Sequence, residues 1–146
     1  MYMVGMVRIL LFLMIFTSGN GIAKSIDNID LYVSYSALAE SAIDHKILVE
    51  KEKYFSNQYL IEVAEDDKNT LFLLKITNYM KKVSSHFQRI ENERGCLTVN
   101  GIGEDGEPIS LFLEYKKERS LWLVNYIHIS MLESPSEYVL LAKCPN

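Results

Sequence analysis

Tyr126 and His128 are the side chains best suited to chemistry in this sequence, since they stand two residues apart in the apolar stretch 121–131. If that stretch is a strand, alternation places both side chains on one face together with Trp122. A phenol, an imidazole and an indole that face a cavity could transfer protons or orient a polar ligand. Glu114 could share their face or lie opposite, because a one-residue register shift reverses the face. The plainer alternative is that Trp122 and Tyr126 belong to the core, with His128 near water.

Other catalytic and metal-binding patterns are missing from the sequence. His45, His86 and His128 lack the short spacings of zinc ligands, so we expect no metal site. The glycines at positions 101 and 103 precede neither a helix nor Gly-Lys-Ser/Thr, which favours a turn or bulge over a phosphate loop. There is no Gly-x-Ser-x-Gly motif. We therefore expect no cofactor, and the lack of a recognisable acid–base pair favours binding over catalysis.

The first 23 residues have the pattern of a secretory signal peptide. They include sixteen apolar residues, one arginine (Arg8) and no acid, and Gly21 and Ala23 supply the small residues before a cleavage site. The predicted cut follows Ala23. The apolar run 9–16 alone is too short to span a bilayer, which needs about 20 residues, although an uncleaved anchor is the alternative. We therefore expect residues 24–146 to form one exported domain, periplasmic or secreted, with membrane contact only before cleavage.

Cys96 and Cys144 both fall in the exported part, where an even cysteine count favours a disulfide. Two separate buried thiols are the alternative. Residues 24–146 carry 14 basic and 19 acidic residues, and this acidic balance excludes a basic nucleic-acid binder.

The elements that must position these residues change character along the chain. Helical periodicity predicts helices over residues 25–43, from 44 to an acidic turn at 65–67, and over 69–83. Alternation predicts strands over 85–92, 96–99, 109–116 and 121–131. Asp105-Gly106 predicts a tight hairpin. Residues 121–131 are apolar on both faces, which predicts a central strand, and residues 138–142 suit a short edge strand or a packed tail. The fold class is therefore α+β, with N-terminal helices on an antiparallel sheet of four to five strands.

This order of elements, with the paired stretches 111–115 and 121–124, resembles the nuclear-transport-factor-2-like superfamily of cone-shaped α+β domains. The resemblance covers Ile29–Leu132, and cystatin-like domains are a neighbouring possibility. It implies a curved sheet that encloses a pocket with the helices, used for catalysis, small ligands or partner binding. No catalytic residue carries over.

Three functions follow as hypotheses. The first is an exported binding domain that holds a small apolar ligand or a protein partner in or beside a sheet-lined cavity, with Trp122, Tyr126, His128 and Glu114 as contacts. The second is an isomerase- or hydratase-like enzyme that uses the same cavity. The third is an inhibitor or immunity protein that blocks a partner enzyme with an acidic surface.

Overall fold

The computed structural model describes residues 29–65 and 70–145. The predicted signal peptide and its cleavage site lie outside these ranges, as does the start of the first predicted helix. Within them, no helix is long and apolar enough to cross a membrane.

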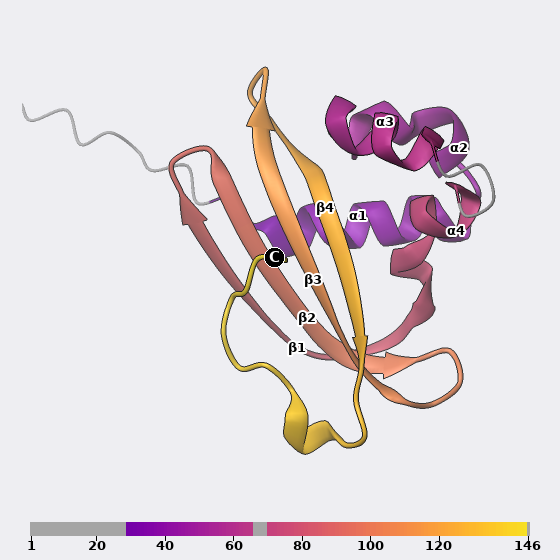
Figure 1. Ribbon diagram of the computed structural model, residues 1–146, viewed down its shortest axis with the longest axis vertical. Helices are drawn as coiled ribbons and strands as arrows, with labels where there is room; N and C mark the ends of the chain where they lie inside the picture. Colours follow the sequence, from indigo (N-terminus) through magenta and orange to yellow (C-terminus); the bar gives the residue numbers. More distant parts are fainter. Residues whose placement is uncertain (1–28, 66–69, 146) are drawn as a thin grey trace, which may run out of the picture.

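Short helices make up the first half of the described chain (Figure 1). Asp30 caps the first of them, because its carboxylate accepts hydrogen bonds from the backbone N–H groups of Tyr32 and Val33 over 2.9 and 3.4 Å. Ser56 caps the helix that begins at Asn57, because its Oγ accepts a hydrogen bond from Tyr59 N–H over 3.1 Å. The elements are α1 (Leu31–Ile43), α2 (Ile47–Glu50), the 3-10 helix η1 (Lys51–Lys53), α3 (Asn57–Glu65), α4 (Thr70–Leu74) and the 3-10 helix η2 (Ile76–Tyr79).

The sheet has four antiparallel strands in the order β1-β2-β3-β4. They are β1 (Met80–Glu91), β2 (Arg94–Gly103), β3 (Pro108–Glu118) and β4 (Leu121–Met131). A hairpin at Asp105-Gly106 is confirmed, with Gly106 at φ 85° between β2 and β3. Its turn is longer than the two residues that the Asp-Gly pair predicts, because Gly103 N donates to Glu107 O over 2.8 Å. The prediction that 121–131 is central is wrong: each strand pairs with the next along the chain, which leaves β4 at the edge.

Two helix predictions fail at positions where the backbone pairs with a strand of the sheet. The helix expected from residue 44 to the acidic turn at 65–67 is interrupted, because residues 54–56 pair with β4 through Val124 N to Tyr54 O at 2.7 Å and Ser56 N to Val124 O at 2.8 Å. The helix expected up to residue 83 ends early, since Met80 pairs with Gly103 and begins β1. In both cases long-range strand pairing outweighs the local helical period.

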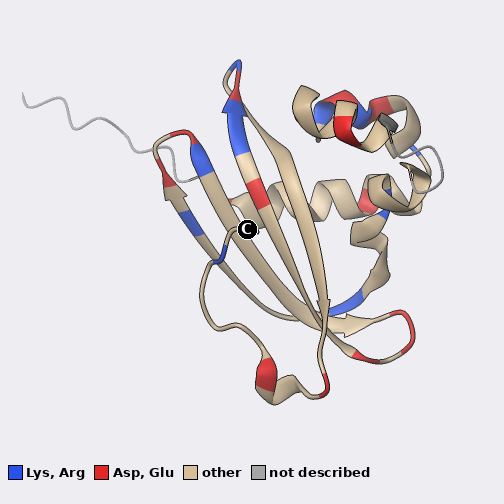
Figure 2. Cartoon of the chain, in the orientation of Figure 1, with Lys and Arg blue, Asp and Glu red and all other residues tan. Residues whose placement is uncertain are grey.

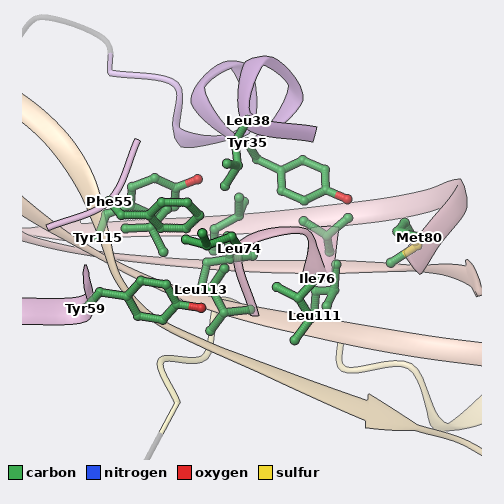
Figure 3. Packing of buried hydrophobic residues seen from close by; sticks show 14 of the residues in the cluster. Tyr35, Leu38, Phe55, Tyr59, Leu74, Ile76, Met80, Leu111, Leu113 and Tyr115 are labelled. Carbon is green, nitrogen blue, oxygen red and sulfur yellow. The ribbon is translucent and has the colours of Figure 1, made fainter. Parts of the chain in front are cut away.

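The hydrophobic core lies between the helices and one face of the sheet (Figure 3). Large side chains fill this space, and many are under 6% exposed. The sheet contributes Leu97, Val99, Leu111, Leu113 and Tyr115, and the helices and their connections contribute Leu31, Tyr35, Leu38, Phe55 and Tyr59.

The C-terminal tail, residues 132–145, packs across the face of the sheet opposite the helices. Asn100 is fully buried there, and its amide donates to Ser85 Oγ over 3.1 Å and to the carbonyl of Val139 over 2.9 Å. Ser110 Oγ donates to Asn100 Oδ1 over 2.6 Å. Backbone N–H of Lys143 donates to Thr98 Oγ1 over 2.9 Å. The segment is therefore the packed tail rather than a fifth strand.

The predicted disulfide is confirmed. Cys96 on β2 is bonded to Cys144 in the tail, and their Cα atoms lie 4.8 Å apart. The bond fastens the end of the tail to the sheet and is compatible with an exported protein.

Candidate functional site

The three aromatic residues predicted to share one face of β4 are separated by the sheet. Trp122 pairs with Lys117 and packs against the core on the helix side. Tyr126 pairs with Glu114, and His128 pairs with Phe112, on the opposite side. The prediction of a common face is therefore wrong, and the cause is a β-bulge between the two groups.

Asn125 forms this bulge, since Val124 pairs with Tyr115 and Tyr126 with Glu114, leaving Asn125 without a partner residue on β3. An extra residue in one strand reverses the alternation beyond it. The Asn125 amide donates to Glu114 Oε1 over 3.1 Å, and its Oδ1 accepts from Ser56 Oγ over 2.8 Å. The bulge thus fastens the start of α3 to the sheet.

Glu114 is held in place by this network and by Arg94. The guanidinium of Arg94 donates to Glu114 Oε2 from Nε over 2.9 Å and from Nη2 over 2.5 Å. The Glu114 side chain is only 18% exposed, so it acts as a half-buried structural acceptor.

Of the predicted contact residues, Tyr126 and Glu114 are brought together. They line a shallow hollow of about 320 Å³ that also includes Gln58, Glu62 and Pro145. His128 lies beside Phe112, with ring centroids 6.2 Å apart, and Lys143 Nζ lies 5.6 Å from the Phe112 ring. Tyr126 is 42% exposed, so this group forms an open surface.

Trp122 lines a different pocket, of about 260 Å³, on the helix side. Its walls include Leu38 from α1, Tyr54, Tyr115 and Val124. Tyr115 is 1% exposed, and among the described residues its hydroxyl has no hydrogen-bond partner. Burial raises the pKa of this phenol above its ordinary value, so the hydroxyl stays protonated.

A cleft of about 920 Å³ lies between α3 and the β3–β4 hairpin. Leu60 and Ile61 come from α3, and Leu121 and Leu123 come from β4, with Phe55 between the two elements. Ile61 and Leu121 are 53% and 55% exposed. The charged residues at this cleft have both signs and are Glu52, Glu62, Lys116, Glu118 and Arg119.

Two features hold the walls of this cleft. Arg119 and Ser120 form the hairpin turn with φ of 48° and 71°, as a tight two-residue turn requires. On the other wall, the bridge between Phe55 and Val124 sets α3 beside β4. Sequence reasoning missed the cleft, because only this long-range bridge brings its walls together. Leu121, the exposed leucine directly after the charged turn 117–120, was the one local signal of the cleft in the sequence.

The histidines lie in three separate environments. His45 contacts Lys75, His86 stacks on Tyr32 with centroids 3.9 Å apart, and His128 lies against Phe112. Across residues 29–65 and 70–145, no three His, Cys, Asp or Glu side chains come close enough to hold a metal ion.

No protein-family model, curated protein or solved structure matches this chain. The geometry of the cleft and of the smaller pocket is therefore the basis for a functional assignment.

Proposed function

We propose that this chain is an exported binding domain that docks a segment of a protein partner in the cleft between α3 and the β3–β4 hairpin. The observation that carries the proposal is that two half-exposed apolar side chains, Ile61 and Leu121, line the same cleft of about 920 Å³ from two different elements. Apolar side chains at the centre with charged residues around them are the usual anatomy of a protein interface. The disulfide and the predicted signal peptide support export.

The chemistry of the cleft favours a peptide segment over a small molecule. Small-molecule sites bury most of the ligand surface, whereas two apolar side chains at this cleft, Ile61 and Leu121, remain about half exposed to solvent. Its charged residues include Glu62 and Glu118 as well as Lys116 and Arg119. The expected occupant is a segment with an aliphatic or aromatic side chain for the floor, flanked by charges of both signs. An inhibitor or immunity protein would be one case of this function.

A small apolar ligand in the Trp122 pocket is the second candidate. The observation that favours it is the buried Tyr115 hydroxyl, which lacks a partner among the described residues and belongs to a residue of the pocket wall. A volume of about 260 Å³ suits a ligand with about one aromatic ring and one hydrogen-bond acceptor. The isomerase or hydratase alternative gains no such support, because Tyr126 and His128 lie across the sheet from this pocket.

The resemblance to cone-shaped domains is carried forward as part of the proposal. Helices that precede an antiparallel meander support it. In domains of that shape the space between helices and sheet holds the ligand, whereas here Tyr115, Phe55 and Tyr59 occupy that space. This filling supports a site at the margin of the sheet.

A random-peptide library selected on the purified, disulfide-bonded chain tests the docking proposal. Selected peptides should bind Ile61→Asp and Leu121→Asp at least about tenfold more weakly, because a carboxylate in an apolar contact loses hydration without gaining a partner. Val49→Asp is the matched control, since Val49 is 89% exposed and does not line the cleft. Failure to select any peptide, or peptides that bind all three variants equally, would overturn the proposal.

The single tryptophan of the chain separates the two candidates. Leu121 lines both the cleft and the Trp122 pocket, so a bound peptide should alter Trp122 fluorescence in a way that Leu121→Asp abolishes. The small-ligand function would instead be favoured if indole-sized or phenol-sized ligands shift this fluorescence and bind Tyr115→Phe more weakly than the unmodified chain.

A further inference from the structure

The outer edge of β4 is open over half its length. Val124 is paired on this side with residues 54–56. From Tyr126 to Met131, however, no backbone hydrogen bond beyond β3 is formed within the described parts of the chain. Figure 1 shows β4 as the last strand on its side of the sheet. Open strand edges are templates for pairing with another chain.

The two edge strands of the sheet differ in their protection. Edge strand β1 carries Lys81, Lys82, Arg89 and Glu91, and its pairing with β2 is irregular at two places. Charges and bulges of this kind discourage edge-to-edge pairing. Strand β4 contains no Asp, Glu, Lys or Arg, and its only bulge, at Asn125, lies before the open part. The open part of β4 is therefore suited to accept another strand.

The phase of the ladder shows which residues offer hydrogen bonds. In an antiparallel strand, alternate residues direct their N–H and C=O groups toward one neighbour and then the other. Leu132 N donates to Pro108 O over 2.9 Å, so Leu132 faces β3. It follows that Ile127, Ile129 and Met131 direct their backbone groups outward.

We propose that two copies of this chain pair through the open edges of β4, antiparallel, about a two-fold axis at Ile129. Opposed residues of an antiparallel pair lie on the same face, so the axis must pass through a residue rather than between two. With the axis at Ile129, Ile127 faces Met131 of the second copy, and all three outward residues are used, giving about six hydrogen bonds. An axis at His128 would use only Ile127 and Ile129.

The length of the open edge fits this register. The second copy's strand ends at Met131, opposite Ile127, and so stops before Val124, where residues 54–56 occupy the edge. Met131 is 64% exposed and lies on the helix side with Ile127, which is 9% exposed. Pairing therefore covers an exposed methionine against the margin of the core.

Charge favours an antiparallel second copy. The end of the sheet with the β3–β4 hairpin carries charges of both signs, since Lys116, Lys117 and Arg119 stand beside Glu118, and the β1–β2 hairpin adds acidic and basic residues there (Figure 2). The opposite end carries five acidic residues, against Lys81 and Lys82 at the start of β1. Antiparallel pairing about Ile129 keeps the two acidic ends apart on opposite sides of the axis, whereas parallel pairing would set them side by side. The five acidic residues are Glu104, Asp105, Glu107, Glu133 and Glu137.

Sedimentation velocity and amide hydrogen exchange test this pairing on the purified, disulfide-bonded chain. Between about 1 and 200 μM the chain should shift from monomer to dimer, as expected for a small interface. In the same range the amides of Ile127, Ile129 and Met131 should become protected, since they have no partner in the monomer. Met131→Lys should weaken the dimer at least about tenfold by placing a charge on Ile127 of the second copy.

The control is Leu140→Lys, because Leu140 is 72% exposed and lies in the tail. It should dimerise like the unmodified chain. If Met131→Lys fails to fold, Ser130→Lys tests the same contact from the other face. A chain that stays monomeric, a dimer that survives the substitution of a folded variant, or a dimer in which the three amides stay unprotected would each overturn the inference. None of these residues lines the α3–hairpin cleft, so the outcome is independent of the docking proposal.

Discussion

Replacing both Cys96 and Cys144 by serine should lower the free energy of unfolding by about 4 kcal/mol. The bond joins residues 48 apart in the chain and closes a loop that contains β3, β4 and the tail. Without the bond, the unfolded chain gains the conformational freedom of that loop. The folded state loses only the one covalent cross-link and keeps its other contacts.

The loss should also be visible locally in the tail. Asn100 is satisfied in part by the carbonyl of Val139, and Lys143 N by Thr98 Oγ1. Once the end of the tail is released, these bonds must hold the segment alone. Amide exchange at Lys143 should therefore accelerate more than exchange at Val99 in the buried part of β2.

Urea denaturation followed by far-UV circular dichroism measures the global effect. With a slope typical of a domain of this size, the midpoint should fall by about 2 M. Reduced wild-type chain is the matched control, because it keeps both sulfur atoms and loses only the cross-link. A loss below about 1 kcal/mol in both samples would refute the reasoning, since the cross-link would then not restrict the unfolded chain as loop closure requires.

Four further predictions concern buried and half-buried polar groups. Asn100→Ala should cost about 2–3 kcal/mol in chemical denaturation, because it leaves the hydroxyls and carbonyl around it without a partner; a cost under about 0.5 kcal/mol would contradict the buried network. Glu114→Gln should cost about 1 kcal/mol and remove the salt dependence of stability that Arg94 confers, which a urea series at low and high salt checks. Tyr115→Phe should be neutral or stabilising, since the hydroxyl has no partner among the described residues. Burial raises the pKa of Tyr115 and Tyr35 in the folded state. Stability should therefore be fully present below about pH 10 and fall at higher pH, because the phenols ionise first in the unfolded chain. The fall with pH should be less steep in Tyr115→Phe, and an equal fall in the variant and the unmodified chain would contradict this.

The order of helices and strands could be predicted from the sequence because the hydrophobic period changes along the chain. The bounds of β4 and the Asp105-Gly106 hairpin agree with local alternation and turn chemistry. The disulfide followed from the cysteine count and the predicted compartment. These features depend on short-range patterns or on pairing of two residues of one type.

The errors arise from contacts between distant segments. The interruption of the helix at residues 54–56 depends on their pairing with Val124, and local periodicity carries no trace of it. The bulge at Asn125 is a single inserted residue in a strand that is apolar on both faces, so alternation continues plausibly through it. That one residue separates Trp122 from Tyr126 and His128.

The edge position of β4 was hidden for a related reason. One face of β4 packs on the core. The other face carries Tyr126 and His128, and His128 lies beside Phe112. Both faces are therefore largely apolar, although β4 has a neighbouring strand of the sheet on only one side. The two apolar faces that suggested a central strand contain no charged residue, and an uncharged edge is able to pair with a second copy.

The affinity of one selected peptide for the unmodified chain, Leu121→Asp and Val49→Asp tests the docking cleft most directly. The account predicts a loss of at least about tenfold, or about 1.4 kcal/mol, for Leu121→Asp and a change below about twofold for Val49→Asp. Equal affinities for all three chains would contradict it and place the binding surface elsewhere on the molecule.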